Sequence, residues 1–167
     1  MRTLIVVDMQ NDFIDGALGT AEAVQIVENV RKKLEQYKAA GDEVIFTRDT
    51  HGEDYLNTPE GKKLPVVHCV KGTVGWEISD KLAVGDSEII DKPTFGYTGW
   101  GGRSFESVEL VGLCTDICVV SNALILKALY PEADITVDAS CCAGVTPQTH
   151  AAALETMKMC QINVTGG

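Results

Sequence analysis

The chain has 167 residues, of which 45 % are apolar, and a formal net charge of −10. This length and composition are typical of one globular domain with a sizeable core, so we expect a single domain over residues 1–167. The negative charge disfavours binding to phosphate-rich surfaces, and we expect neither nucleic acid nor membrane as a partner.

The cysteines and the first residues indicate the compartment. The six cysteines show no zinc-type pairing, and the apolar run Leu4–Val7 is too short for a signal peptide. No apolar stretch reaches the roughly 20 residues that a membrane-spanning helix needs. We therefore expect reduced thiols and a cytoplasmic protein, and the sequence leaves a homo-oligomer open.

The first half of the chain alternates strand and helix patterns. The apolar run Thr3–Asp8 predicts a strand that is buried on both faces. An amphipathic helix is expected at Ala21–Ala40, with Val24 on its core face, because apolar residues recur at helical spacing. The remaining expected elements are a strand at Glu43–Thr47, a short helix at Trp76–Leu82 after a long loop, and a strand at Ser87–Ile90.

The second half continues the alternation. Four glycines make Gly96–Gly102 a loop, and the strand Val108–Gly112 follows it. Thr115 and Asp116 are favourable N-cap residues for a helix at Ile117–Leu129. The last expected elements are a strand at Ile135–Val137, a helix at Pro147–Cys160 and a strand at Ile162–Val164. Such alternation predicts a parallel sheet with helices on both faces.

Four reactive side chains lie at or just beyond the ends of predicted strands. They are Asp8, Asp49, Lys92 and Cys118. In a parallel sheet the carboxyl ends of the strands meet at one edge, which is where ligands bind. We therefore expect these four side chains on the same rim of the sheet.

Asp8, Lys92 and Cys118 together carry the groups that a thiol nucleophile needs. Cys118 falls in the first turn of a predicted helix, where the helix dipole favours a thiolate. Asp8 can accept the thiol proton and return it to a leaving group, and Lys92 supplies positive charge. Each residue also has a plain structural interpretation: a packed cysteine, a strand-ending acid and a solvated lysine.

Asp49, His51, Glu60 and His68 form a candidate metal site. An aspartate and a histidine two residues apart, with a distant second histidine, can bind one ion and leave coordination positions open. This donor set suits zinc, manganese or iron and gives no sharp choice among them. His51 as a surface residue and His68 as a packed core residue are the alternatives, and we expect His150 to cap or pack in the last helix.

Three motifs resemble the isochorismatase-like cysteine hydrolases. The stretch Val7–Phe13 is similar to their opening motif, and Lys92–Phe95 and Gly112–Val119 are similar to their lysine and cysteine motifs. Within that superfamily, Asp49-x-His51 with the later His68-Cys69-Val70 resembles the nicotinamidase (pyrazinamidase) branch. The resemblance extends over almost the whole chain.

The resemblance implies a fold and a set of roles. The fold is a three-layer α/β/α sandwich with a six-stranded parallel sheet, and the catalytic triad is Asp8, Lys92 and Cys118. A cis peptide between Leu113 and Cys114 would place the Cys114 N–H beside that of Cys118 in an oxyanion hole. Phe13 would line the substrate pocket, and Glu60 would join the metal ligands.

The sequence therefore predicts a metal-dependent cysteine amidohydrolase that converts nicotinamide, or a close heteroaromatic amide, to the acid and ammonia through a thioester. Two alternatives stay open. One is hydrolysis of another small amide, such as an N-carbamoyl compound. The other is a non-catalytic or redox-sensing thiol protein, since Cys114, Cys118, Cys141 and Cys142 offer several thiols. Thr50, Pro65 and the short segment Gly99–Glu106 depart from the usual pattern of the branch and alter the pocket walls.

Overall fold

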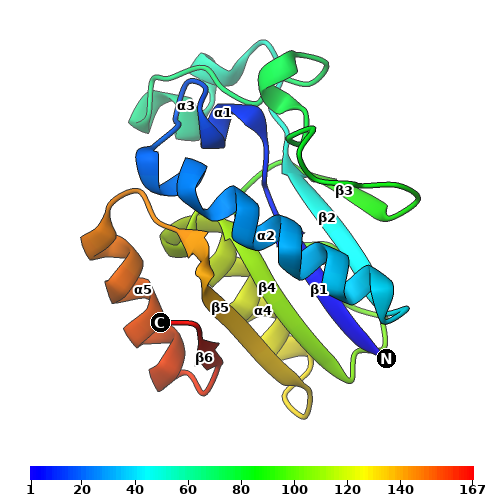
Figure 1. Ribbon diagram of the computed structural model, residues 1–167. Coiled ribbons are helices and arrows are strands. Elements are labelled where there is room, and N and C mark those ends of the chain that lie inside the picture. Colours follow the sequence, from blue (N-terminus) through cyan, green and yellow to red (C-terminus); the bar gives the residue numbers. More distant parts are fainter.

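The computed structural model describes residues 1–167, and its centre is one parallel sheet (Figure 1). The strand order is β3-β2-β1-β4-β5-β6, and every pairing is parallel. The expected six-stranded parallel sheet of the α/β class is confirmed. The strands are β1 Arg2–Val7, β2 Glu43–Asp49, β3 Glu88–Lys92, β4 Ser107–Leu113, β5 Asp134–Ala143 and β6 Asn163–Thr165.

Helices cover both faces of this sheet and make three layers. In Figure 1, α2 crosses the front of the sheet and α4 lies behind it, while the segments with α1 and α3 gather at the carboxyl ends of the strands. None of the helices combines the length and the apolar sequence needed to cross a membrane. Their bounds are α1 Asn11–Ile14, α2 Ala21–Ala39, α3 Pro59–Lys63, α4 Val120–Leu129 and α5 Pro147–Met159.

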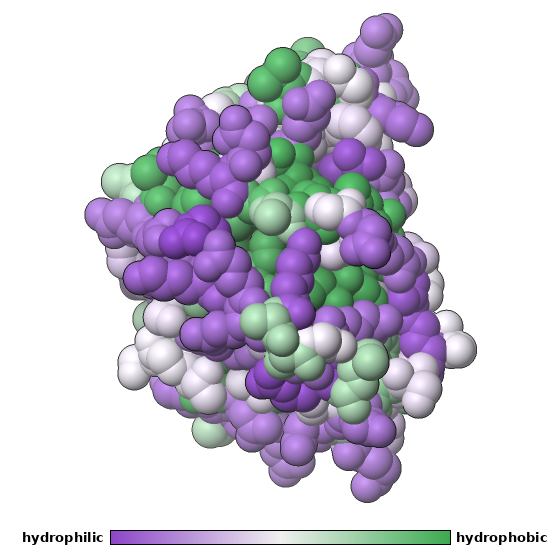
Figure 2. All heavy atoms as spheres, turned by 45° about the vertical axis from the view of Figure 1, so that its right-hand side comes forward, coloured by the Kyte–Doolittle hydropathy of each residue, from purple (hydrophilic) through white to green (hydrophobic).

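The core divides into two clusters because successive side chains of a strand point to opposite faces. In β1, Leu4 packs in the cluster under α2, and Ile5 packs in the cluster under α4 and α5. The α2 face differs from the expectation at one position, since Val24 is 47 % exposed while Ala23 and Ile26 are buried. Hydrophilic side chains cover most of the surface seen in Figure 2 and enclose one apolar area.

Three expected elements were wrong in type or length. Trp76–Leu82 is not a helix: a 3₁₀ turn spans Val74–Trp76, and Ile78 then pairs with Gln10 in an isolated bridge. The helix expected from Ile117 begins as a π-helical turn at Thr115–Val119. The strand expected at Ile135–Val137 is a ten-residue β5, because its register on β4 shifts between Leu110 and Gly112 and pairing then continues to Ala143.

The short connection between β3 and β4 is closed by aromatic side chains. Trp100 is fully buried in a 3₁₀ turn within the expected loop. Its ring meets Tyr97 edge-on at 5.1 Å between centroids and Phe105 at 6.3 Å. These rings pack against the cluster that α4 covers, so the sheet face is protected without a helix in this connection.

Candidate active site

Asp8 lies immediately after β1, the central strand of the sheet. Its backbone is left-handed, with φ +49°, and its N–H donates to the Thr47 carbonyl on β2 at 3.1 Å. The Thr47 hydroxyl donates to Asp8 Oδ1 at 2.7 Å. An aspartate tolerates this backbone conformation better than most residues. The turn leaves its carboxylate fully buried at the carboxyl edge of the sheet.

Lys92, the last residue of β3, is the ion-pair partner of Asp8. Its ammonium group donates to Asp8 Oδ2 at 2.7 Å and to the Thr94 carbonyl at 3.1 Å, and both charged side chains are fully buried. Burial lowers the pKa of Lys92, but Asp8, Cys118 and Asp49 together outweigh burial and raise it. Burial also raises the pKa of Asp8, although Lys92 opposes this rise. The pair therefore joins a permanent cation to a carboxylate of increased basicity.

Cys118 lies in the π-helical turn after β4 and is 4 % exposed. Burial and the nearby Asp8 charge raise the pKa of this thiol well above its usual value, and Lys92 only partly opposes them. Burial therefore opposes the thiolate that the start of a helix favours. The resting group is a thiol beside a base.

The backbone before Cys118 takes an unusual course. The peptide between Leu113 and Cys114 is cis, as the resemblance implies. Gly112 has φ +121°, and a Cβ there would come within 2.1 Å of the Val7 carbonyl, so only glycine fits. The Cys114 N–H donates no hydrogen bond within the protein. It is therefore free to bind an oxygen of a ligand.

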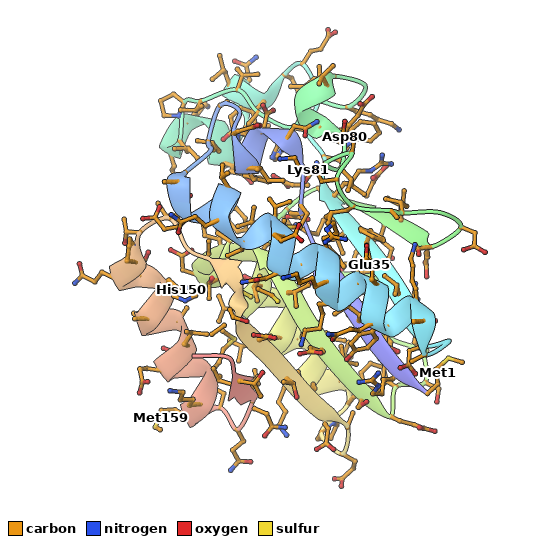
Figure 3. The ribbon with its side chains drawn as sticks, viewed as in Figure 1. Met1, Glu35, Asp80, Lys81, His150 and Met159 are labelled. Atoms are coloured by element: carbon orange, nitrogen blue, oxygen red, sulfur yellow. The ribbon has the colours of Figure 1, made fainter.

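Thr115 and Asp116 do not cap a helix as expected. The Thr115 hydroxyl bonds His150 Nδ1 at 2.7 Å, and Asp116 accepts from the Val145 N–H at 3.2 Å. His150 lies on the side of α5 that faces the sheet (Figure 3), whereas the N-cap of that helix is Thr146. These contacts tie the turn that carries Cys118 to the start of α5.

The four candidate metal ligands meet at one point. Single ligand atoms of Asp49, His51, Glu60 and His68 all lie within 4.8 Å of one another. The Nε2 atom of His51 is 2.9 Å from Asp49 Oδ2 and 3.2 Å from Glu60 Oε2. The Nε2 atom of His68 is 3.5 Å and 3.9 Å from the same two oxygens. Four ligands at zinc distances in a tetrahedron are about 3.4 Å apart, so these spacings fit an ion.

Two further features of this quartet fit a metal ion. The Oδ1 atom of Asp49 is the single buried side-chain polar atom without a hydrogen-bond partner. His68 Nδ1 donates to the Val66 carbonyl at 2.7 Å, which leaves its Nε2 lone pair directed at the quartet. Burial alone would raise the pKa of Asp49, but the neighbouring His51, His68 and Lys92 together lower it to about 2, so the carboxylate is ionised at neutral pH.

A cavity of about 520 Å³ joins the two groups of residues. Cys118, Cys114 and three members of the quartet line it, while Asp8 and Lys92 are buried behind the wall. Phe13 lines the cavity as expected, and its ring centroid is 5.5 Å from that of His68. The structure thus brings every predicted site residue to one cavity or directly behind it.

Two buried amide side chains hold this arrangement, and the sequence analysis assigned a role to neither. Gln10 accepts from the Asp49 N–H and donates to the Asp49 and Trp76 carbonyls, each at 2.8 Å. Asn122 donates to the Cys118 carbonyl at 2.8 Å and accepts from the Tyr97 N–H at 2.8 Å. Gln10 stands within the opening motif, but nothing in the local pattern indicates its partners, the nearest of which is 39 residues away.

Comparison with known proteins places the chain among hydrolases of one family. The family model of the isochorismatase domain matches residues 2–166. Nicotinamidase/pyrazinamidase of Mycobacterium tuberculosis is 29 % identical over 98 % of this chain and 98 % of that protein. The structure of pyrazinamidase of Pyrococcus horikoshii in complex with zinc is 30 % identical, with a TM-score of 0.83 over 99 % of both chains. A probable inactive nicotinamidase of Arabidopsis thaliana is 31 % identical over 93 % of this chain and 87 % of that protein.

Proposed function

Because the chain belongs to the isochorismatase family and resembles its nicotinamidase branch, we propose that it is a cysteine amidohydrolase that converts nicotinamide to nicotinic acid and ammonia. The observation that carries the proposal is a thiol with a buried carboxylate–ammonium pair behind it, opening on a cavity whose wall holds four metal ligands. One relative is named inactive, so activity must be argued from the side chains of this chain.

The thiol and the carboxylate carry the first half of the proposed reaction. Cys118 attacks the amide carbon while Asp8 takes the thiol proton, a role that suits a carboxylate whose pKa is raised by burial. Lys92 and Thr47 each hold one oxygen of Asp8, which keeps the base in place. The free Cys114 N–H, with that of Cys118, stabilises the negative oxygen of the tetrahedral intermediate.

The proton that Asp8 takes from Cys118 is used again in the second half of the reaction. Asp8 passes it to the departing ammonia, which leaves an acyl thioester on Cys118. Asp8 then accepts a proton from the water that attacks the thioester. The carbon–sulfur bond breaks to release the acid, and Asp8 returns the proton to the Cys118 sulfur. An ion bound by Asp49, His51, Glu60 and His68 would supply a Lewis-acid contact to the ring nitrogen; zinc is our first choice, with manganese and iron as alternatives.

Ammonia release from a panel of amides tests this proposal. We expect zinc-loaded protein to hydrolyse nicotinamide faster than benzamide and faster than N-carbamoyl amino acids. A preference for N-carbamoyl compounds would assign the chain to the alternative substrate class. Absence of ammonia from every amide would overturn the proposal.

Thiol alkylation with and without a substrate analogue separates the hydrolase from a redox protein. Burial raises the pKa of Cys141 to about 11 and raises that of Cys142 as well, so both stay protonated and resist oxidation. We expect substrate analogues to protect one slowly reacting thiol, Cys118, and to leave the exposed Cys160 unprotected. Reversible disulfide formation between the other cysteines under peroxide would favour the redox function.

A further inference from the structure

The cavity is much larger than the substrate that the proposed function assigns to it. Its volume is about 520 Å³. A nicotinamide molecule fills roughly 120 Å³, which is the liquid volume that about four water molecules occupy. Even with the ring and the amide in place, most of the cavity is left for another part of a substrate.

The reactive groups occupy only the inner part of the cavity. Cys118, His68 and Phe13 are buried or half-buried there. The outer wall consists of other side chains, and it is mostly apolar. The lining includes the apolar side chains Leu18, Leu64, Phe95, Ile117 and Val145, of which Leu18 and Ile117 are half-buried like Phe13.

Three of these outer side chains are unusually exposed for their type. Leu64 is 42 % exposed, Phe95 40 % and Val145 52 %. They come from three separate segments, after α3, after β3 and before α5, so the tertiary fold brings them to one opening. Apolar side chains that gather around a cavity indicate an apolar ligand group.

The chemistry of the ring fixes where such a group would be attached. In nicotinamide, ring carbon 2 lies between the nitrogen, directed at the metal ligands, and the carbon that bears the amide, directed at Cys118. Ring carbon 5 is opposite carbon 2. A substituent on carbon 5 therefore points away from both anchors and toward the outer wall.

We propose that this site takes nicotinamides with an apolar substituent on ring carbon 5, which the outer wall of Leu64, Phe95 and Val145 covers. This inference rests on the proposed function, whose ring orientation it uses. Each methylene group that leaves water for the cavity should raise kcat/KM about fourfold.

A homologous series measures this directly. We would compare nicotinamide with its 5-methyl and 5-butyl derivatives, and measure the affinities of the corresponding nicotinic acids by calorimetry. Three added methylenes predict about a sixtyfold gain from methyl to butyl. A gain of tenfold or more in either measurement supports the proposal, and a smaller gain in both overturns it.

Two leucines on neighbouring segments provide a matched pair of variants. Leu64→Gln should reduce the increase in kcat/KM and in affinity from the methyl to the butyl compound, since it makes the outer wall polar. Leu56→Gln should leave the gain intact, because Leu56 is 48 % exposed and lies outside the cavity. Equal slopes in the two variants would overturn the assigned wall.

A negatively charged substituent on ring carbon 5 tests whether the outer part of the cavity binds anions instead of apolar groups. Lys63 also lines the cavity and supplies a positive charge there. If 5-carboxynicotinamide outperforms the 5-butyl compound, the outer region binds anions and the apolar proposal is wrong. Loss of ammonia from every compound, with the affinity gain retained in the acids, would overturn the proposed function and leave this inference standing.

Discussion

The thiol–carboxylate–ammonium cluster and the metal-ligand quartet are neighbours that the fold builds in different ways. Asp8 and Lys92 come at the ends of β1 and β3, and Cys118 comes in the turn after β4. All three are almost fully buried. The register of the sheet therefore holds the cluster, because Lys92 ends a paired strand, and Asp8 and Cys118 follow strands that are paired in the sheet.

The quartet depends on a long irregular segment instead. Only Asp49 belongs to a strand, while His51, Glu60 and His68 follow within residues 50–68. This segment is held by the bridge between His51 and Val70 and by the bond from the Cys69 N–H to Asp12 Oδ2 at 2.8 Å. Glu60 is also the least buried of the four side chains.

The thiol–carboxylate–ammonium cluster and the quartet therefore differ in how easily their side chains can be moved. The end of a paired strand cannot shift without breaking its ladder of hydrogen bonds. A loop held at a few points can be altered with less effect on the rest of the fold. The following changes test this difference, from the largest expected effect to the smallest.

Cys118→Ala should abolish turnover while the quartet stays able to bind zinc. Removing the nucleophile leaves no route to the thioester, and we expect kcat to fall by at least about a thousandfold. Circular dichroism and zinc content should match the unchanged protein, because the substitution removes only one buried sulfur. Turnover above about one per cent of the original rate would contradict the covalent mechanism.

Lys92→Met should destabilise the protein by about 3–5 kcal/mol, because it leaves the Asp8 carboxylate buried without its cation. Urea unfolding measures this loss. Without Lys92, only the hydrogen bond from the Thr47 hydroxyl opposes the effect of burial on Asp8, so the folded-state pKa of Asp8 rises further. The loss should be full above that pKa and should shrink as the pH falls through it, since protonation removes the buried charge.

The matched control for this change is Lys158→Met. Lys158 pairs with Glu155 at 3.0 Å on the surface of α5, where the side chains are 49 % and 69 % exposed. An exposed pair of this kind contributes at most about 1 kcal/mol. Similar losses in the two variants would show that the Asp8–Lys92 pair does not hold the reacting cluster together.

Gln10→Glu should weaken zinc binding by about 10- to 100-fold, the usual effect of removing a hydrogen-bond partner behind a metal ligand. The glutamate keeps the shape but loses the donors to the Asp49 and Trp76 carbonyls. Competition with a chelator measures the affinity. Gln25→Glu adds the same charge on the exposed side of α2 and should leave it unchanged. Equal zinc affinities in the unchanged protein and in both variants would mean that the segment 50–68 orients the quartet without Gln10.

Metal removal should have the smallest effect on kcat/KM, and this effect should be larger for nicotinamide than for benzamide. If the quartet orients the ring nitrogen, the loaded protein should favour nicotinamide over benzamide by at least about tenfold in kcat/KM, or about 1.4 kcal/mol. Chelation or His51→Ala should erase most of that preference. Measuring both substrates with and without metal gives the coupling energy. Equal losses for both substrates would instead assign the ion to activation of water.

The sequence by itself determined the strands and the rim that they form. Apolar runs such as Leu4–Val7 can be buried only in a sheet with both faces covered, and the carboxyl ends of parallel strands share an edge. This local rule was enough to place Asp8, Lys92 and Cys118 together. Their catalytic roles stay a prediction, as do the roles of Phe13 and Cys114.

Only the tertiary structure decided how these side chains are held. Thr115 binds His150 instead of capping a helix, Gln10 holds Asp49, and Asn122 holds the Cys118 turn. Thr115 and Gln10 are 35 and 39 residues from these partners, and Asn122 also accepts from the Tyr97 N–H, 25 residues away. Polar side chains in such contacts follow no periodic pattern, because their partners are set by packing. The same reason explains why Trp76 ends a 3₁₀ turn: its indole N–H binds Thr50, and its ring stacks under Arg48.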